Sequence, residues 1–356
     1  MAATEPYWRA LEDANSLTTP YQRYDLLALW QRHVGLECGA RPFIVIAFNA
    51  TAVPLFLWPF CQRMIGRRRI IEFLGGKHAN FNMGLWRRDV AGTISAAEIR
   101  AVIEQLAPYA DALWLTGQPL TWDGTTNPFA LLPHQRSANF GFSGSLTADF
   151  DALLRARTIA ATRKKMRKKQ RALAGYGNVR FELVAAGTKL RGVLDTFFKQ
   201  KGARMRVLGI PDAFAAAEIR RFIEAAATEQ LPNGAPLIEI YALSVDDIVV
   251  ATLGGIVGGG RFSCMFNSIA QGHYANESPG EQLIVNLVRR CCERGFATFD
   301  LGIGEARYKN LFCSDAEPQF DSFLPLSRAG WPLTAAARIA AAIKRTVKQH
   351  PALWAL

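Results

Sequence analysis

One segment constrains the fold more than any other: ESPGEQLIVNLVRRCCERGFATFDLGIGEARYKNLF, residues 277–312. Its start predicts a helix N-terminus, because Ser278 is a good N-cap residue and Pro279 fits the first turn, where no N–H group is lost. Apolar residues then recur at helical spacing over 281–293 and stop before a glycine, which is typical of a helix C-terminus. A short apolar strand over 296–301 follows, so the segment reads as loop, helix, turn and buried strand.

The start of this helix is also a candidate phosphate site, because the first backbone N–H groups of a helix lack intrahelical partners and attract anions. We therefore expect cofactor binding by residues of the helix start and of the strand before it: Ser278, Gly280, Glu281, Gln282, Asn267 and Ser268. Titratable residues follow the helix and make the same region a candidate reaction site: Asp300, Glu305, Tyr308 and Lys309.

The order of these parts resembles the GNAT acyltransferase superfamily. The residues that carry the resemblance are Ser278-Pro279-Gly280 before the helix, and Phe299-Asp300-Leu301-Gly302, Gly304-Glu305 and Tyr308-Lys309 after it. Upstream segments fit the same pattern: RKKMRKKQRAL at 163–173, VRFELV at 179–184, TPYQRYDLLALWQRHVG at 19–35 and VPLFLWPF at 53–60. The resemblance spans roughly residues 19–325. It is strongest to the CelD-like acetyltransferases of bacterial polysaccharide biosynthesis, a branch related to the Fem-type peptidyl transferases.

The resemblance implies an α/β fold with mixed α+β sheets, built as two tandem GNAT-like acyltransferase domains. It implies acetyl-CoA, or another acyl-CoA, as the cofactor, and N- or O-acyl transfer to a sugar or polysaccharide-related acceptor, with acetyl as the expected group. Two alternatives stay open. One is an aminoacyl-tRNA-dependent transferase of the Fem type. The other is a non-catalytic GNAT-like module in polysaccharide synthesis, which the acids Glu277 and Glu281 beside the phosphate loop keep open.

Strand and helix patterns alternate along the chain, which favours mixed sheets in two domains. We expect an N-terminal GNAT-like domain over 1–145, a C-terminal acyltransferase domain with the cofactor site over 146–330, and an amphipathic helix over 331–356. The stretch 117–140, rich in Pro, Gly, Thr and Asn, is predicted to be a long loop between the domains. The alternative is one irregular domain with a large N-terminal extension.

Acyl transfer from a thioester needs an activated acceptor, a polarised carbonyl and a stabilised leaving thiolate. The family chemistry gives Asp300, and after it Glu305, the role of positioning the acceptor or acting as general base. Tyr308 would protonate the thiolate, and Lys309 would hold an anion of substrate or cofactor. A backbone N–H near Asn267–Ser268 would polarise the carbonyl. Structural roles compete with these, since an acid at a strand end often caps the next element.

Four polar residues are candidates for binding the acceptor. His273 and Tyr274 precede the phosphate loop and would line the acceptor cleft, whereas His78 and Asn80 would offer polar groups to a glycan hydroxyl from the first domain. A lone His in a loop is more often a surface or packing residue. The glycines over 254–260 lie between two predicted strands, which favours a hairpin and close strand packing over a nucleotide loop.

The formal net charge of +12 is concentrated in one helix. Seven cations occupy 163–171, inside a helix predicted over 148–174 with Thr147 as N-cap and a break near Arg157–Thr158. A partly apolar stripe would dock this helix on the protein: Ile159, Thr162, Met166 and Leu173. The cations over Arg163–Arg171 would then form either a solvated face or a site for an acidic partner. The candidate partners are CoA phosphates, an acidic glycan or lipid surface, and last RNA, because stacking aromatics are missing from the helix.

Composition excludes several other classes. The six cysteines form no C-x-x-C pair, so we expect reduced core thiols, and no cluster has metal-site spacing, so no metal is expected. No apolar run reaches about 18 residues and no secretory signal is evident, which predicts a cytoplasmic protein with the option of peripheral contact with the inner membrane face. The last helix repeats Ile339, Ile343 and Val347 and closes with Leu353, Trp354 and Leu356. It is expected either to pack on the domain or to lie on a membrane surface.

Overall fold

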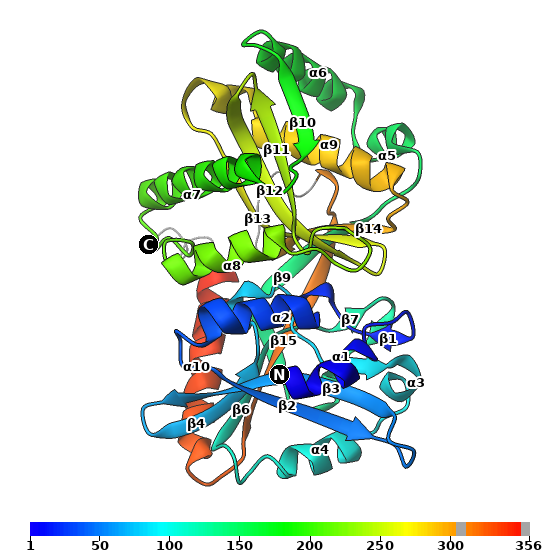
Figure 1. Ribbon diagram of the computed structural model, residues 1–356, viewed down its shortest axis with the longest axis vertical. Helices are drawn as coiled ribbons and strands as arrows, with labels where there is room; N and C mark the ends of the chain where they lie inside the picture. The colour runs from blue at the N-terminus through cyan, green and yellow to red at the C-terminus, as the bar shows by residue number, and fades with distance from the viewer. Residues whose placement is uncertain (304–310, 350–356) are drawn as a thin grey trace. The chain divides into compact units, whose positions relative to one another are not determined.

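The computed structural model describes residues 1–303 and 311–349, and it divides into two compact units (Figure 1). Unit 1 comprises Met1–Gly141 together with Ala316–Leu356, and unit 2 comprises Phe142–Asp315. Each unit combines helices with parallel and antiparallel strands, which confirms the predicted mixed α/β class. The chain passes into unit 2 within one strand and returns to unit 1 at the start of another, so unit 1 contains both ends of the chain.

The sheet of unit 1 contains eight of the described strands. Its strand order is β1 (Ser16–Leu17), β5 (Leu85–Arg87), β3 (Pro54–Ile65), β4 (Arg68–Phe73), β6 (Ala112–Pro119), β15 (Asp315–Pro325) and β9 (Gln135–Ser145), with β2 (Arg41–Phe48) paired to β3. A small hairpin lies apart: β7 (Thr121–Trp122) and β8 (Thr125–Thr126). The helices are α1 (Glu5–Arg9), α2 (Tyr24–Trp30), α3 (Arg88–Ala91), α4 (Ala96–Glu104) and α10 (Gly330–Gln349).

Aromatic packing and a capped helix hold unit 1 together. Trp58 of β3 stacks on Phe56 and contacts Phe129, whose rings are all buried. Burying such side chains dominates the energetics of a core. Helix α4 starts with a complete capping box, in which the Ser95 hydroxyl accepts from the Glu98 N–H and the Glu98 carboxylate accepts from the Ser95 N–H. Ser95 is a typical N-cap residue, so this helix start can be predicted from the sequence.

The sheet of unit 2 has the strand order β10 (Val179–Leu183), β11 (Glu239–Val245), β12 (Ile248–Gly258), β13 (Arg261–Ile269) and β14 (Thr298–Ile303). Strand β9, whose last residues belong to unit 2, is the next neighbour of β14. The helices are α5 (Phe150–Arg157), α6 (Ala160–Ala174), α7 (Thr188–Leu208), α8 (Ala217–Thr228) and α9 (Pro279–Glu293). Helices α7 and α9 cover different faces of this sheet (Figure 1).

The two units repeat one topology. In unit 1 the antiparallel strands β2, β3 and β4 are followed by α4 and by β6, which pairs with β4 in parallel. In unit 2 the antiparallel strands β11, β12 and β13 are followed by α9 and by β14, which pairs with β13 in parallel. A parallel pair needs such a crossover helix. The predicted tandem arrangement is confirmed at this level.

Several local predictions differ from the structure. The predicted loop over 117–140 contains the β7–β8 hairpin, a 3₁₀ turn at Pro128–Leu131 and the start of β9. The predicted helix over 148–174 is two helices, α5 and α6, with the predicted break at Thr158, but the cap of α5 is Asp149, whose carboxylate accepts the Ala152 N–H. Residues 316–330 group with unit 1, whereas the sequence placed them in the second domain. Their strand β15 pairs with β6, a contact between distant segments that no local pattern reveals.

The cationic helix α6 docks through fewer residues than predicted. Leu173 is buried, and Met166 and Thr162 are half-buried. Ile159 is 72% exposed, because it lies in the break before the helix and its backbone is extended. The partly apolar stripe that docks α6 is therefore one turn shorter than the sequence predicted.

The glycines of β12 permit close packing, as predicted. A Cβ atom on Gly254 would lie 2.3 Å from the ring of Phe266, which packs on Phe197 of α7. Gly255 stands in the same relation to Phe262. Side chains larger than hydrogen would push these rings out of the core.

We predict that Gly254→Ala lowers the free energy of unfolding by about 1–3 kcal/mol, the usual cost of overpacking a core. Gly192→Ala is the matched control, because a Cβ there meets no atom within 4 Å and α7 gains helix propensity. The control should raise the free energy of unfolding by up to about 1 kcal/mol. Urea unfolding followed by circular dichroism measures both, and an equal effect of the two substitutions would contradict the packing described.

Candidate functional site

A buried ion pair fastens the parallel strands β13 and β14. The Arg261 Nε donates to Asp300 Oδ2 at 2.6 Å, and the Ser263 hydroxyl donates to the same oxygen at 2.6 Å. The other oxygen, Oδ1, accepts the N–H of Gly302 at 2.9 Å. Asp300 is fully buried and Arg261 is 6% exposed. The strands pair in parallel at this level, where Ser263 lies opposite Asp300.

These contacts argue against the predicted role of Asp300 as a general base. A base must reach the proton of the acceptor within about 3 Å, whereas this carboxylate has no accessible surface and its two oxygens bind groups of β13 and β14. A buried, paired carboxylate is what a structural link between two strands requires. The geometry of Asp300 therefore favours a positioning role, in which it holds β13 against β14.

The start of α9 has an unusual backbone. Ser278 is at the N-cap with φ 52°, in the left-handed region that favours glycine. Its hydroxyl makes no capping bond, contrary to expectation, and instead binds the ammonium of Lys169 on α6. Pro279 is at the first helical position, as predicted. Backbone strain of this kind concentrates at functional sites, where surrounding contacts hold it in place.

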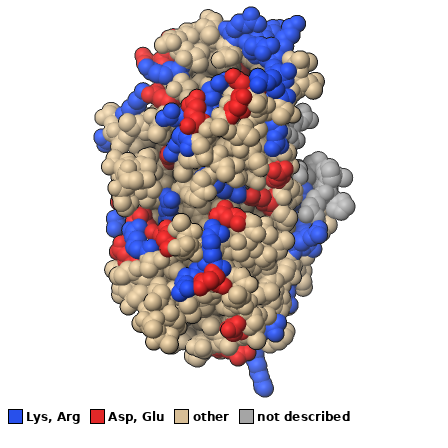
Figure 2. Space-filling model, turned by 90° about the vertical axis from the view of Figure 1, so that its right-hand side faces the viewer, with Lys and Arg blue, Asp and Glu red and all other residues tan. Residues whose placement is uncertain are grey.

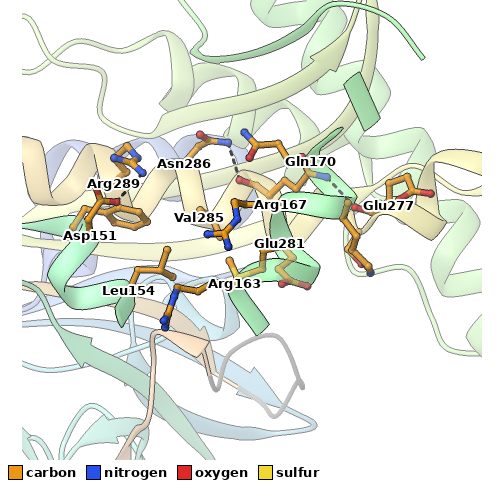
Figure 3. A pocket seen from close by; sticks show the side chains of 15 residues that line it. Asp151, Leu154, Arg163, Arg167, Gln170, Glu277, Glu281, Val285, Asn286 and Arg289 are labelled. Atoms are coloured by element: carbon orange, nitrogen blue, oxygen red, sulfur yellow. Dashed lines mark hydrogen bonds and ion pairs between the residues drawn. The ribbon is translucent and has the colours of Figure 1, made fainter. Parts of the chain in front are cut away.

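The loop and the first turn of α9 border a cavity of about 350 Å³. Figure 3 shows the side chains that line it, which come from α5, α6, α9 and the loop before α9. The predicted cofactor residues Ser278, Glu281 and Gln282 are among them, so the structure brings these three together. Gly280 is not among the lining residues, and a Cβ added there would come within 2.6 Å of Ile269 Cδ1.

Charges of both signs line this cavity. Three cations of α6 contribute to it: Arg163, Arg167 and Lys169. The acids are Asp151, Glu277 and Glu281. Arg289 of α9 is paired with Asp151 at 3.2 Å and lies over the Phe150 ring at 4.2 Å, so this cation is already engaged. The side of the cavity that is formed by the α6 cations and the start of α9 is suited to an anion.

The end of β13 is held by two residues of α7. The Ser268 hydroxyl donates to Gln200 Oε1 at 2.7 Å, and the Lys201 ammonium donates to the Asn267 carbonyl oxygen at 3.1 Å. Burial lowers the pKa of Lys201. A lysine that loses its proton more readily than usual, beside the strand predicted to polarise the acyl group, is a candidate for acid–base work.

His273 and Tyr274 lie in the short 3₁₀ segment Gly272–Glu277 before α9. Their rings contact each other with centroids 3.9 Å apart, and both contact Tyr176, just after α6. This aromatic cluster joins the phosphate loop to the end of the cationic helix. The two residues therefore shape the loop, and His273 stays exposed.

His78 and Asn80 belong to unit 1 and have partners there. The Trp30 Nε1–H donates to His78 Nδ1 at 3.0 Å, and burial lowers the pKa of His78 to about 4. Asn80 donates to the Tyr21 hydroxyl at 3.1 Å. Both side chains are half-buried. Glu305, Tyr308 and Lys309 fall outside the described residues.

Three functional candidates went unrecognised in the sequence. Lys169 was counted in the cationic run, but its contact with Ser278 joins residues 109 positions apart. Gln200 and Lys201 end a helix pattern and carry no motif. Only the fold shows that α6 and α7 reach the two ends of the same loop region. Local spacing held no signal for these contacts.

The second unit matches a known family. Residues 160–310 match the family model described as the acetyltransferase (GNAT) domain. This part of the chain is similar to that domain, and the match covers less than half of the chain. The match supports an acyltransferase of the GNAT type, as the sequence predicted. No curated protein matches the sequence as a relative.

Three solved structures share the fold over nearly the whole chain. FemX is 10% identical, with a TM-score of 0.60 over 94% of this chain and 98% of its own. The C-terminal domain (DUF2156) of a candidate lysylphosphatidylglycerol synthetase from Agrobacterium fabrum is 11% identical, with a TM-score of 0.54 over 97% and 96%. A conserved protein of unknown function from Bacteroides thetaiotaomicron is 11% identical, with a TM-score of 0.52 over 91% and 97%. At such low identity the likeness shows the fold alone.

Two kinds of feature are absent from residues 1–303 and 311–349. No group of three or more His, Cys, Asp or Glu side chains there could hold a metal ion. No helix in these ranges is both long and apolar enough to cross a bilayer.

We predict that Asp300→Asn lowers the free energy of unfolding by about 3–5 kcal/mol, because it leaves the buried Arg261 guanidinium without its carboxylate. The double variant Arg261→Met with Asp300→Leu should be less destabilised, since it removes both charges. Glu281→Gln, at the cavity wall, is the control and should leave the unfolding midpoint nearly unchanged. Thermal unfolding checks all three. A variant Asp300→Asn with the parent's midpoint and a large loss of turnover would restore the general-base role.

Proposed function

We propose that this chain transfers an acyl group, most simply acetyl, from acyl-CoA to a hydroxyl or amine of a sugar or polysaccharide-related acceptor. The cavity at the start of α9 supports this proposal most directly. It joins a helix N-terminus to the α6 cations Arg163, Arg167 and Lys169, inside the segment that matches the GNAT acetyltransferase domain. Phosphates of a nucleotide-bearing donor need this combination of backbone N–H groups and cations.

The donor is proposed to enter with its phosphates at the loop. Lys169 binds the Ser278 hydroxyl and so stands within reach of the first turn of α9. The cavity volume, about 350 Å³, suits part of such a molecule and not the whole, because pockets for drug-sized ligands run from about 300 to 1,000 Å³. The remainder would extend from the loop along β13. Glu277 and Glu281 would face the donor's hydroxyl or amino groups.

The acyl end is proposed to lie near the end of β13. Strand β13 runs from Arg261 to Ile269, and the described pairs that join it to β14 run from Arg261 to Ser263. The backbone near Asn267 and Ser268 would polarise the thioester carbonyl. Lys201 contacts the Asn267 carbonyl. In its neutral form, the Lys201 amine would accept a proton from the hydroxyl or amine of the acceptor.

The remaining roles stay proposals. Glu305, Tyr308 and Lys309 would complete the proton transfers, and His273 and Tyr274 would line the acceptor side of the loop. His78 and Asn80 would bind acceptor hydroxyls from unit 1. We also propose that the chain belongs to the CelD-like branch and acts in the cytoplasm.

An aminoacyl-tRNA donor is the second candidate, and the outer face of α6 favours it. Five cations on this helix are exposed: Lys164, Lys165, Arg167, Lys168 and Arg171. Figure 2 shows a dense group of basic side chains at the top of this face, where Figure 1 places α6. A free acyl-CoA does not require so many cations, whereas a nucleic acid backbone does. The fold likeness to FemX fits this candidate.

We predict that the parent binds acetyl-CoA and that Lys169→Met weakens binding about 10-fold, because one phosphate-directed cation is lost at a desolvated site. Lys199→Met is the control, since Lys199 is an exposed cation of α7 and the cavity lining does not include it. Isothermal titration calorimetry measures both. Equal affinities for the two variants would place the donor phosphates elsewhere.

The outer cations separate the two donors. The triple variant Lys164→Gln, Lys165→Gln and Lys168→Gln should keep acetyl-CoA affinity, because these side chains do not line the cavity. If the donor is aminoacyl-tRNA, the same variant should bind nucleic acid more weakly. The slope of log affinity against log salt concentration should also become shallower, by the value of about three phosphate contacts. Filter binding of tRNA at several salt concentrations decides between the donors.

We predict that Lys201→Met lowers turnover at least 10-fold without lowering stability at pH 7. Burial lowers the pKa of Lys201, so the protonated amine costs stability in full below the folded-state pKa. This cost is removed as the pH rises from that pKa towards the higher pKa of the unfolded chain. Removing the amine removes the cost. Release of free thiol from acetyl-CoA with a panel of acceptors measures turnover. The parent rate should rise with pH through this pKa, and the variant should lack that rise. An identical pH profile in both would exclude the role.

A further inference from the structure

The C-terminal helix α10 turns its apolar side toward solvent. Ile339 and Ile343 are 60% and 59% exposed, and Val347 is 37% exposed. Because the three are four residues apart, they form one row along the helix. The exposed residues Ala336 and Ala340 extend this row with further apolar surface. A helix that packs on its own domain usually buries such a row.

The opposite side of α10 holds the helix on unit 1. Thr334 is 2% exposed, and Arg338 donates to the Phe323 carbonyl at 2.7 Å. Arg345 donates to the Arg136 carbonyl at 2.9 Å, and Lys348 binds the Asn139 side chain. These contacts come from both halves of the helix and fix its rotation about its axis. The exposed position of the isoleucines is therefore built into the packing of the helix.

The helix is also basic throughout. Residues 330–349 contain four cations and no acid. Lys344 and Lys348 lie one turn apart, and the pKa of Lys348 is lowered by burial and by the charge of Lys344. Like charges at this spacing destabilise an isolated helix. An anionic surface next to α10 would relieve this repulsion.

We propose that α10 docks unit 1 on an anionic lipid surface, with Ile339, Ile343 and Val347 in the acyl boundary and Lys344, at the edge of this row, at the headgroups. Interfacial helices combine an apolar row with lysines in this way, and they need no matching groove. A second copy of the chain fits less well, because it would bring the same cations and no acid to pair with them. This inference is independent of the donor and acceptor proposed for unit 2.

The test is co-sedimentation of the full chain with vesicles at about 0.1 M salt, where screening leaves only close charges effective. Vesicles of phosphatidylcholine alone are compared with vesicles in which a third of the lipid is phosphatidylserine. We expect binding to the anionic vesicles. Ile339→Ser with Ile343→Ser should abolish it, and Lys344→Gln should weaken it roughly 5-fold, the value of one headgroup cation.

Two control variants test whether vesicle binding depends on α10 or on exposed apolar and charged residues in general. Ile248→Ser changes an isoleucine that is 53% exposed in the β11–β12 hairpin, and Lys164→Gln with Lys168→Gln removes two cations one turn apart on α6. Both should bind like the parent. All substituted positions are exposed, and circular dichroism verifies that each variant is folded.

Three outcomes would overturn the proposal. The first is unchanged binding after the isoleucine substitutions, and the second is loss of binding only in the α6 variant. The third is a parent chain that does not bind anionic vesicles and forms a stable dimer in light scattering, which Ile339→Ser with Ile343→Ser dissociates. That last result would assign the exposed row to a second copy of the chain.

Discussion

The ion pair between Arg261 and Asp300 is the interaction on which the candidate site depends. It fastens β13 to β14, and β13 leads into the candidate site. Beyond it, β13 carries Asn267 and Ser268 to the side chains of α7, and its end leads through the aromatic loop to α9. Because both charged groups are buried, loss of either would disturb the two strands together. The geometry of the candidate site in unit 2 is thus tied to a buried carboxylate.

The same topology occurs in unit 1, but its crossover helix α4 is capped differently from the crossover helix α9 of unit 2. Helix α4 begins with a complete capping box, which satisfies its first N–H groups internally. Helix α9 begins at a left-handed serine whose hydroxyl binds Lys169, so its first turn is not capped by its own side chain. An uncapped helix start beside cations suits an external anion, and a capped one does not. This contrast explains why the donor site is proposed for unit 2 alone.

Features with a local cause could be predicted from the sequence. The capping box at Ser95, the hairpin across Asp246–Asp247 and the helix after Pro279 follow from neighbouring residues, and all three occur. The site depends on distant contacts, which no local pattern encodes. The sequence predicted Asp300 as an acceptor-positioning residue or general base, and it gave no sign of the partner Arg261, which lies 39 residues away. It gave no sign of Lys201 either, because this lysine reaches Asn267 across 66 residues. The apolar repeat of α10 was also visible, but only its packing shows that the row faces outward.

Hydrogen exchange with and without acetyl-CoA tests the central claim most directly, because it reports on the loop, the helix start and the cationic helix at once. The account predicts that saturating acetyl-CoA slows amide exchange in peptides covering 276–283 and in peptides of α6, while α4 in unit 1 exchanges as before. Protection confined to other segments, or no protection at any concentration of acetyl-CoA, would contradict an acyl-CoA site at the start of α9.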